Sequence, residues 1–162
     1  MTQRQFILLA ALGSAAMLLG ALAFQHLGGL APCKLCIWQR WPHGIAVAAG
    51  ALGLLALAPL MATTGALVSL AGAGIAFYHT GVERGWWPGP DTCTAGGDIG
   101  QLDPNALFDQ IMAAPLVRCD EVAWEFLGLS MASWNGLVSL GLAALWLMAL
   151  RAPRQASSSA SQ

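Results

Sequence analysis

Apolar residues form three long uncharged runs in this 162-residue chain, at 6–24, 44–78 and 134–150. The first and last runs each approach the roughly 20 residues that cross ~30 Å of hydrocarbon. The run 44–78 would be ~52 Å long as a single helix, so we expect it to fold as a hairpin of two helices. The pattern therefore predicts four membrane-spanning helices, at about 6–25, 41–59, 62–79 and 133–150.

Two features of the long run support a hairpin. Its only turn-forming residues are Pro59 and the Thr-Thr-Gly cluster at 63–65, which favours a turn near 60–61. In the third span, Gly65, Ser69 and Ala73 recur every four residues and form a ridge of small side chains. Such a ridge suits close packing between helices in a membrane.

Composition supports an all-α membrane protein. The chain is 57% apolar and only 9% charged, whereas soluble domains average about 25% charged residues. The formal net charge of -1 gives no reason to expect nucleic acid as a partner. We expect one membrane domain over 1–150 and a disordered, Ser/Ala-rich tail over 151–162. A cleavable signal peptide is the alternative for the first span, but its apolar run exceeds the usual 7 to 15 residues.

Two polar segments, 26–40 and 80–132, separate the predicted spans on one side of the membrane. All eight acidic residues lie within the longer segment, between Glu83 and Glu125. Asp103-Pro104 resembles a helix start, with an N-cap residue followed by proline. An apolar stripe follows it, so we expect a short interfacial helix in this outer loop.

Cys33 and Cys36 carry the most informative chemistry. If Pro32 opens the second helix, Cys33, Cys36 and Arg40 share one face of it. A disulfide closing so few residues would contribute only about 2 kcal/mol to stability, which favours a reversible redox pair over a structural bridge. Ile37 stands where a haem-binding motif needs histidine. Zinc would need a second ligand pair, so we predict no metal.

The other two cysteines, Cys93 and Cys119, both lie in the long outer segment. Closing the flexible loop between them would cost on the order of 3.5 kcal/mol of chain entropy, so a bridge there would be relatively oxidising. A plain structural disulfide remains the alternative. Beside a Cys-x-x-Cys pair, a redox relay is favoured.

Arg40 and His79 lie near the predicted outer ends of their helices. Arg40 follows Cys36 by one turn, so it could stabilise a thiolate and donate a hydrogen bond to a quinone carbonyl. The alternative for Arg40 is an ordinary snorkelling side chain. His79 is a weaker candidate for a quinone-site donor and His43 weaker still.

The cysteines indicate the compartment of each side of the membrane more clearly than the distribution of basic residues does. Four crossings place both termini on one side and both cysteine segments on the other. Disulfide chemistry persists in oxidising compartments, so we expect the cysteine segments in the periplasm and both termini in the cytoplasm. Counting basic residues in short segments points weakly the same way.

The sequence resembles the DsbB family of disulfide bond formation proteins. The resemblance is carried by residues 32–43 (PCKLCIWQRWPH), 78–79 (YH), 81–83 (GVE), 87–90 (WPGP) before Cys93, and 124–129 (WEFLGL) after Cys119. It extends over about residues 6–150. It implies a four-transmembrane-helix bundle in the bacterial inner membrane. The implied activity is a thiol:quinone oxidoreductase that sustains disulfide formation in exported proteins.

The resemblance also implies roles for the four cysteines. Cys93 would form a mixed disulfide with a soluble, thioredoxin-like DsbA protein, and Cys119 would resolve it. The Cys33–Cys36 disulfide would then reoxidise the Cys93–Cys119 pair. Cys36 would face the quinone, either ubiquinone or menaquinone, with Arg40 and less securely His79 as quinone-binding residues.

Three alternatives compete with this interpretation. A vitamin K epoxide reductase-like thiol oxidoreductase is disfavoured, because its loop cysteines precede the Cys-x-x-Cys pair. A non-enzymatic thiolate metal carrier predicts bound zinc or copper. A structural membrane subunit would carry disulfides that never turn over.

Overall fold

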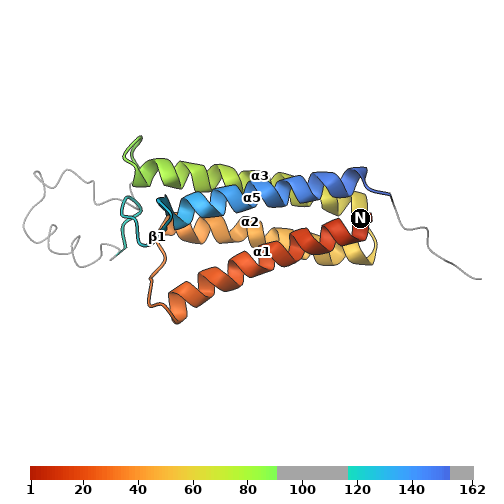
Figure 1. The fold of residues 1–162 in the computed structure, drawn as a ribbon, viewed down its shortest axis with the longest axis horizontal. Helices are drawn as coiled ribbons and strands as arrows, with labels where there is room; N and C mark the ends of the chain where they lie inside the picture. Colours follow the sequence, from red (N-terminus) through yellow and green to blue (C-terminus); the bar gives the residue numbers. More distant parts are fainter. Residues whose placement is uncertain (91–116, 154–162) are drawn as a thin grey trace, which may run out of the picture.

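Four long helices form the body of the protein, described here from a computed structural model for residues 1–90 and 117–153 (Figure 1). A two-residue β-hairpin precedes the last helix. The elements are α1 (Gln3–His26), α2 (Lys34–Leu55), α3 (Ala58–Glu83), β1 (Glu125–Phe126), β2 (Leu129–Ser130) and α5 (Met131–Arg151).

The four helices form an antiparallel bundle. Helix α1 packs on α2 and α5, and α3 packs on the same two helices from the other side. The N-terminus and the end of α5 lie at one end of the bundle, and the start of α2 and the β-hairpin lie at the other (Figure 1). Helix α1 leans away from the other three toward its His26 end (Figure 1).

The predicted break in the long apolar run is confirmed, but it falls earlier than expected. Helix α2 ends at Leu55 and α3 begins at Ala58, whereas the turn was expected near 60–61. Pro59 lies in the first turn of α3, where its missing N–H has no intrahelical partner to lose. Proline therefore opens α3, and residues 63–65 are helical.

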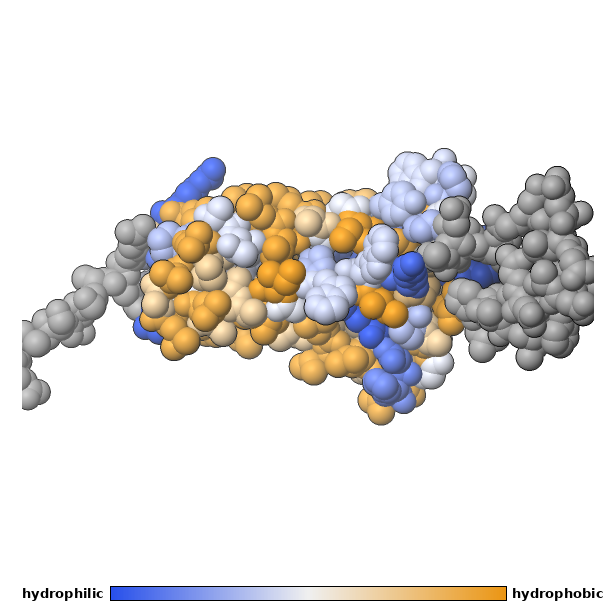
Figure 2. Space-filling view, turned by 180° about the vertical axis from the view of Figure 1, so that it is seen from behind, coloured by the Kyte–Doolittle hydropathy of each residue, from blue (hydrophilic) through white to orange (hydrophobic). Residues whose placement is uncertain are grey.

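Three of the described helices, α1, α3 and α5, are long and apolar enough to cross a membrane. Helix α2 has 22 residues and would span about 33 Å, but its first turns carry Lys34, Gln39 and Arg40. Large apolar side chains are exposed along the bundle, among them Leu12, Leu67 and Leu137. Hydrophobic residues cover much of its flank and hydrophilic ones lie toward the two ends (Figure 2). The chain is a multi-pass membrane protein.

The small-residue ridge on α3 is buried, as predicted. Ser69 is 4% exposed and Ala73 is 2% exposed. At Gly65, the absence of a side chain leaves room for the indole of Trp146 from α5, which is fully buried. The close approach of α3 and α5 therefore depends on this glycine.

We expect Gly65→Ala to destabilise the bundle by about 1–3 kcal/mol, because the added Cβ would overlap the Trp146 ring. Gly74 lies on the same helix, with no atom within 4 Å of the place that an added Cβ would take. Gly74→Ala is therefore the matched control, expected to be neutral or stabilising by up to about 1 kcal/mol through helix propensity. Unfolding in detergent micelles measures both; equal stability of the two variants would contradict this packing.

The β-hairpin before α5 was not expected from the sequence. Glu125 pairs with Ser130 and Phe126 with Leu129, and the turn residues Leu127 and Gly128 have φ of 53° and 75°. Two residues with positive φ form the turn that matches the twist of a two-residue hairpin. Ser130 then caps α5 by accepting a hydrogen bond from the Ser133 N–H.

Several predictions fall on residues 91–116 and 154–162, outside the described residues. They are the interfacial helix after Asp103-Pro104, the surroundings of Cys93, and the disorder of most of the tail. The predicted membrane boundaries also stay predictions.

Candidate redox site

Cys33 and Cys36 lie where α2 begins, with their sulfurs in contact. Cys33 is the N-cap of α2, and its sulfur accepts a hydrogen bond from the Cys36 N–H at 3.1 Å. The two Sγ atoms are 2.8 Å apart, with Cys33 donating to Cys36, and both cysteines are free thiols. Lys34 is the first helical residue, so the expectation that Pro32 opens the helix is wrong by two residues. The N-cap preference for a side-chain acceptor is met by sulfur.

The surroundings of Cys33 favour the protonated form of this residue. Its hydrogen bond to Cys36 and its burial both raise the pKa of the Cys33 thiol above the ordinary value. If one thiol of the pair ionises, the negative charge therefore resides on Cys36. A thiolate at Cys36, the nucleophilic form of the residue, stays a prediction.

Cys119 comes from the far end of the long outer segment and joins the same cluster. It is fully buried, and it packs with Cys33, Leu35 and Val82, beside Cys36. It is disulfide-bonded. Its neighbours Arg118 and Asp120 pair through two hydrogen bonds of 3.0 and 2.6 Å, and the hydrogen bonds from Arg118 lower the pKa of Asp120. The structure thus brings three of the four predicted cysteines together, while Cys93 lies outside the described residues.

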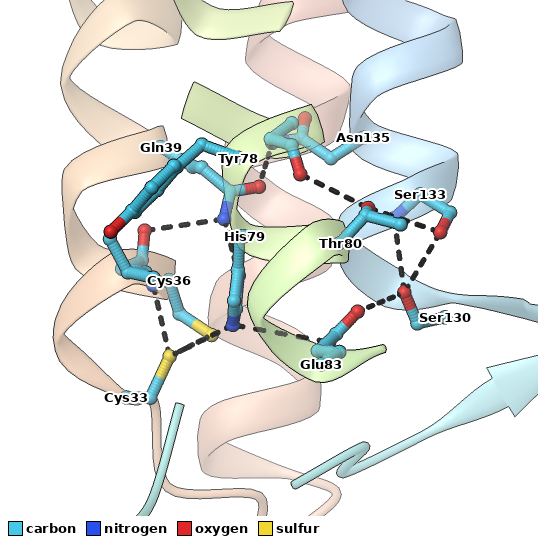
Figure 3. Close-up of polar contacts among 12 residues, drawn as sticks. Cys33, Cys36, Gln39, Tyr78, His79, Thr80, Glu83, Ser130, Ser133 and Asn135 are labelled. Atoms are coloured by element: carbon cyan, nitrogen blue, oxygen red, sulfur yellow. Dashed lines mark hydrogen bonds and ion pairs between the residues drawn. The ribbon is translucent and has the colours of Figure 1, made fainter. Parts of the chain in front are cut away.

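His79, from the last turns of α3, contacts the dithiol directly. Its Nε2 is 3.6 Å from the Cys33 sulfur and 3.9 Å from a Glu83 carboxylate oxygen. The other carboxylate oxygen of Glu83 accepts a hydrogen bond from Ser130 (Figure 3). His79 therefore lies at the thiols, closer to the chemistry than the sequence alone indicated.

Two buried amides that the sequence analysis did not single out complete the polar interior. Gln39 donates to His79 Nδ1 at 2.7 Å, and Asn135 of α5 donates to the Gln39 side-chain oxygen. His43 Nε2 lies 2.8 Å from the Asn135 oxygen. Asn135 is the one amide within 131–150, and a polar side chain at membrane depth indicates a role by default. A lone amide in a predicted membrane span is therefore a sequence signal that could have identified Asn135.

An apolar cavity of about 390 Å³ opens beside the dithiol, between α1 and the outer ends of the other helices. Cys33, Cys36, Arg40 and His79 line it on one side. The facing wall includes Met17, Phe24, Leu30, Trp124, Phe126 and Trp134. Its size falls within the range of small-molecule pockets.

Aromatic rings and Arg40 shape this cavity. Trp124 lies 5.2 Å from Phe24 of α1 and stacks on Phe126 of the hairpin at 6.0 Å, between ring centroids. Arg40 is half-buried and donates to the Gln25 side chain of α1 at 2.7 Å. This bond uses one of the five N–H donors that a guanidinium carries. Arg40 can therefore offer donors and positive charge to a molecule in the cavity.

Apolar helices around a buried dithiol that borders an apolar cavity are the features of a membrane thiol oxidoreductase. Comparison with known proteins agrees. A family model described as disulfide bond formation protein DsbB matches residues 3–149. The chain belongs to this family, and it is a membrane thiol oxidase, a protein-disulfide oxidoreductase of disulfide bond formation.

Individual relatives cover most of the chain. A disulfide bond formation protein B from Polaromonas naphthalenivorans is 34% identical over 90% of this chain and 91% of its own length. Those from Methylococcus capsulatus and Pasteurella multocida are 36% and 37% identical, over 90% and 75% of this chain and 92% and 71% of their own lengths. Membership of this family favours the thiol oxidase over the metal carrier, the structural subunit and the vitamin K epoxide reductase-like enzyme.

Proposed function

We propose that this oxidase takes electrons from a DsbA-like dithiol protein and passes them to a membrane quinone. In the overall reaction the partner's two thiols become a disulfide and the quinone becomes a quinol. Two electrons and two protons leave the partner, and the same number reach the quinone. The observation that carries the proposal is the cluster of buried Cys33 and Cys119 with the partly buried Cys36 at the edge of the apolar cavity.

The relay would consist of three exchanges. A partner thiolate attacks the Cys93–Cys119 disulfide and forms a mixed disulfide with Cys93, releasing Cys119 as a thiolate. The partner's second thiol, in place of Cys119 as the resemblance implied, then attacks the partner sulfur of the mixed disulfide, which leaves an oxidised partner and a reduced Cys93/Cys119 pair. Attack by Cys119 on Cys93 would instead release the partner in its reduced form. That pair reduces the Cys33–Cys36 disulfide by the same exchange chemistry. Burial of Cys119 against Cys33 and Leu35 favours this last exchange.

The cavity fits a quinone ring by chemistry and size. Its wall is mostly aliphatic and aromatic, its volume is about 390 Å³, and its polar side carries Cys36, Arg40 and His79. When bound there, a quinone would accept two electrons and two protons. Arg40 would hold it through a hydrogen bond to a carbonyl oxygen, and Cys36, as the thiolate of the pair, would face it.

The same proposal includes the topology. Helix α2 would be the fourth crossing, since about 33 Å exceeds the hydrocarbon thickness of ~30 Å. The membrane would be the bacterial inner membrane, with both termini in the cytoplasm and the cysteine end in the periplasm. Support comes from the placement of the N-terminus and the end of α5 at the end of the bundle opposite the start of α2 (Figure 1).

The proposal is tested with purified protein in detergent, a reduced DsbA-like protein and a soluble quinone analogue. We expect quinone absorbance to fall in step with the loss of partner thiols, one quinone for each disulfide formed. Partner oxidation that continues without any quinone consumption would refute quinone as the acceptor. Labelling of single cysteines from either side of inverted vesicles tests the topology.

We expect Arg40→Gln to raise the KM for the quinone analogue about 10- to 100-fold, because a hydrogen bond to a charged group contributes about 1.5–3 kcal/mol. Arg84→Gln is the matched control. Arg84 is exposed at the end of α3 against Trp86 and does not line the cavity. An unchanged KM in the Arg40 variant, or an equal rise in both variants, would remove Arg40 from the quinone site.

A further inference from the structure

A chain of hydrogen bonds crosses the bundle from His43 to Cys36 and passes through Gln39 and His79. Its members are 3–8% exposed, apart from the partly exposed Cys36 at its end. Figure 3 shows the part that joins Asn135, Gln39, His79 and the two cysteines. Each amide or imidazole in it could in principle face either way, so the direction of donation needs a fixed point.

The fixed point is the backbone carbonyl of Leu35. Gln39 Nε2 lies 3.3 Å from this oxygen, and a carbonyl only accepts hydrogen bonds. The Gln39 side chain must therefore present its NH2 group on this side. The second hydrogen of the same NH2 group points to His79 Nδ1 at 2.7 Å.

This orientation determines the tautomer of His79. Because Nδ1 accepts a hydrogen bond from Gln39, it carries no proton, and a neutral imidazole must then carry its proton on Nε2. Nε2 faces the Cys33 sulfur and a Glu83 oxygen. The sulfur and the carboxylate both accept a hydrogen bond from an N–H.

The orientation of Gln39 also determines the direction of the other hydrogen bonds in the series. Because Gln39 presents its oxygen to Asn135, the Asn135 NH2 group is the donor there. The Asn135 oxygen then faces His43, whose Nε2 must donate. At the other end, Cys33 donates to the Cys36 sulfur. All five bonds thus run in one direction, and hydrogen bonds in such a series polarise one another.

We propose that Gln39 is the positioning residue that holds His79 as the Nε2–H tautomer, so that the imidazole presents a donor and not a lone pair to the dithiol. This inference rests on the proposed thiol relay for its purpose. In that relay, the one-way chain would place negative charge on Cys36, beside the quinone cavity.

The tautomer has a second consequence, for metal ions. The sulfurs of Cys33 and Cys36 and Nε2 of His79 lie within 4.8 Å of one another, close enough to bind one ion together. Two thiolates and an imidazole are good zinc ligands. A nitrogen that carries a proton cannot ligate, so Gln39 withholds the third ligand from soft metals that would block the thiols.

The tautomer itself is measured in the parental protein. Protein labelled with ¹⁵N-histidine, with His79→Ala to assign the resonances, should show a protonated Nε2 and an unprotonated Nδ1 at His79. A protonated Nδ1 would overturn the proposal. This measurement needs neither a partner protein nor quinone, so its failure is distinct from failure of the proposed function.

Gln39→Glu replaces the amide that donates to His79 Nδ1 with a carboxylate that accepts, while the side chain keeps its length. A carboxylate accepts a hydrogen bond from Nδ1–H, so Nδ1 should become protonated and Nε2 should become available as a ligand. Carboxylate–histidine–metal pairs of this kind change metal affinity about 10- to 100-fold. We therefore expect reduced Gln39→Glu protein to bind Co²⁺ about 10- to 100-fold more tightly than the parental protein, followed by thiolate–cobalt absorption.

Two controls make the cobalt result specific. Adding His79→Ala to Gln39→Glu should abolish the gain, because the third ligand is then missing. Gln39→Met neither donates nor accepts at Nδ1, so it should not reproduce a gain of this size. Equal Co²⁺ affinity in the parental and Gln39→Glu proteins, or a gain that survives His79→Ala, would overturn the inference.

Discussion

Replacement of Cys36 by serine should abolish quinone reduction. Both sulfurs line the apolar cavity, but Cys36 accepts the hydrogen bond from Cys33, so Cys36 is the sulfur placed to react as a thiolate there. Serine keeps the shape of the side chain, but it can form neither a thiolate nor a disulfide. The Cys33–Cys36 disulfide would then be absent, and electrons from the outer pair would have no route to quinone.

The Cys36→Ser variant should still react once with the partner. Mixing it with reduced DsbA-like protein should oxidise at most one equivalent of partner through the outer disulfide, with no loss of quinone absorbance afterwards. Gly74→Ala, which places a methyl group in open space on α3, serves as a control for handling in detergent. Turnover of Cys36→Ser at the parental rate would remove the inner dithiol from the relay.

The helical bundle could be predicted because its signal is long and local. Uncharged runs long enough to cross a bilayer identified the helices, and the small-residue ridge on α3 identified a packed face that Trp146 now fills. The residues at which the helices begin and end were harder to predict. Pro59 suits the end of one helix or the first turn of the next, and only the packed structure shows that it opens α3.

Part of the site was equally accessible from sequence. Cys33 and Cys36 were identified by their spacing, and Arg40 by its place one turn below Cys36. The gathering of Cys119 beside Cys33 was not predictable from spacing, because two helices and the long outer segment separate them along the chain. The hairpin turn at Leu127 was hidden as well, since leucine rarely adopts positive φ.

The buried amides show a different limit. Gln39 and Asn135 lie on separate helices, and neither has a motif of its own. Their role depends on which atom donates in each hydrogen bond. The backbone carbonyl of Leu35 orients the Gln39 amide, and the Gln39 amide in turn determines which His79 nitrogen carries the proton. Sequence can flag a polar residue in an apolar span, but the identity of the donor at each bond requires coordinates.

Replacement of Cys93 by alanine should abolish partner-driven turnover by a different route. The proposed relay begins when a partner thiolate attacks the sulfur of Cys93, so alanine removes both the mixed disulfide and the outer disulfide with Cys119. The inner site is untouched, because Cys33, Cys36 and Arg40 come from α2 and the residue just before it. The loss should therefore be confined to electron entry from the partner.

Dithiothreitol distinguishes the defect at the inner dithiol in Cys36→Ser from the defect in electron entry in Cys93→Ala. As a small dithiol it should reduce the Cys33–Cys36 disulfide directly, so Cys93→Ala should still consume quinone with dithiothreitol above the uncatalysed background, and Cys36→Ser should not. Trapping with a DsbA-like partner that lacks its second cysteine should give the opposite pattern, with a mixed disulfide in Cys36→Ser and none in Cys93→Ala. A mixed disulfide that persists in Cys93→Ala would place partner attack on the Cys33–Cys36 disulfide, because Cys119 is then a thiol and exchange requires a disulfide sulfur as the target.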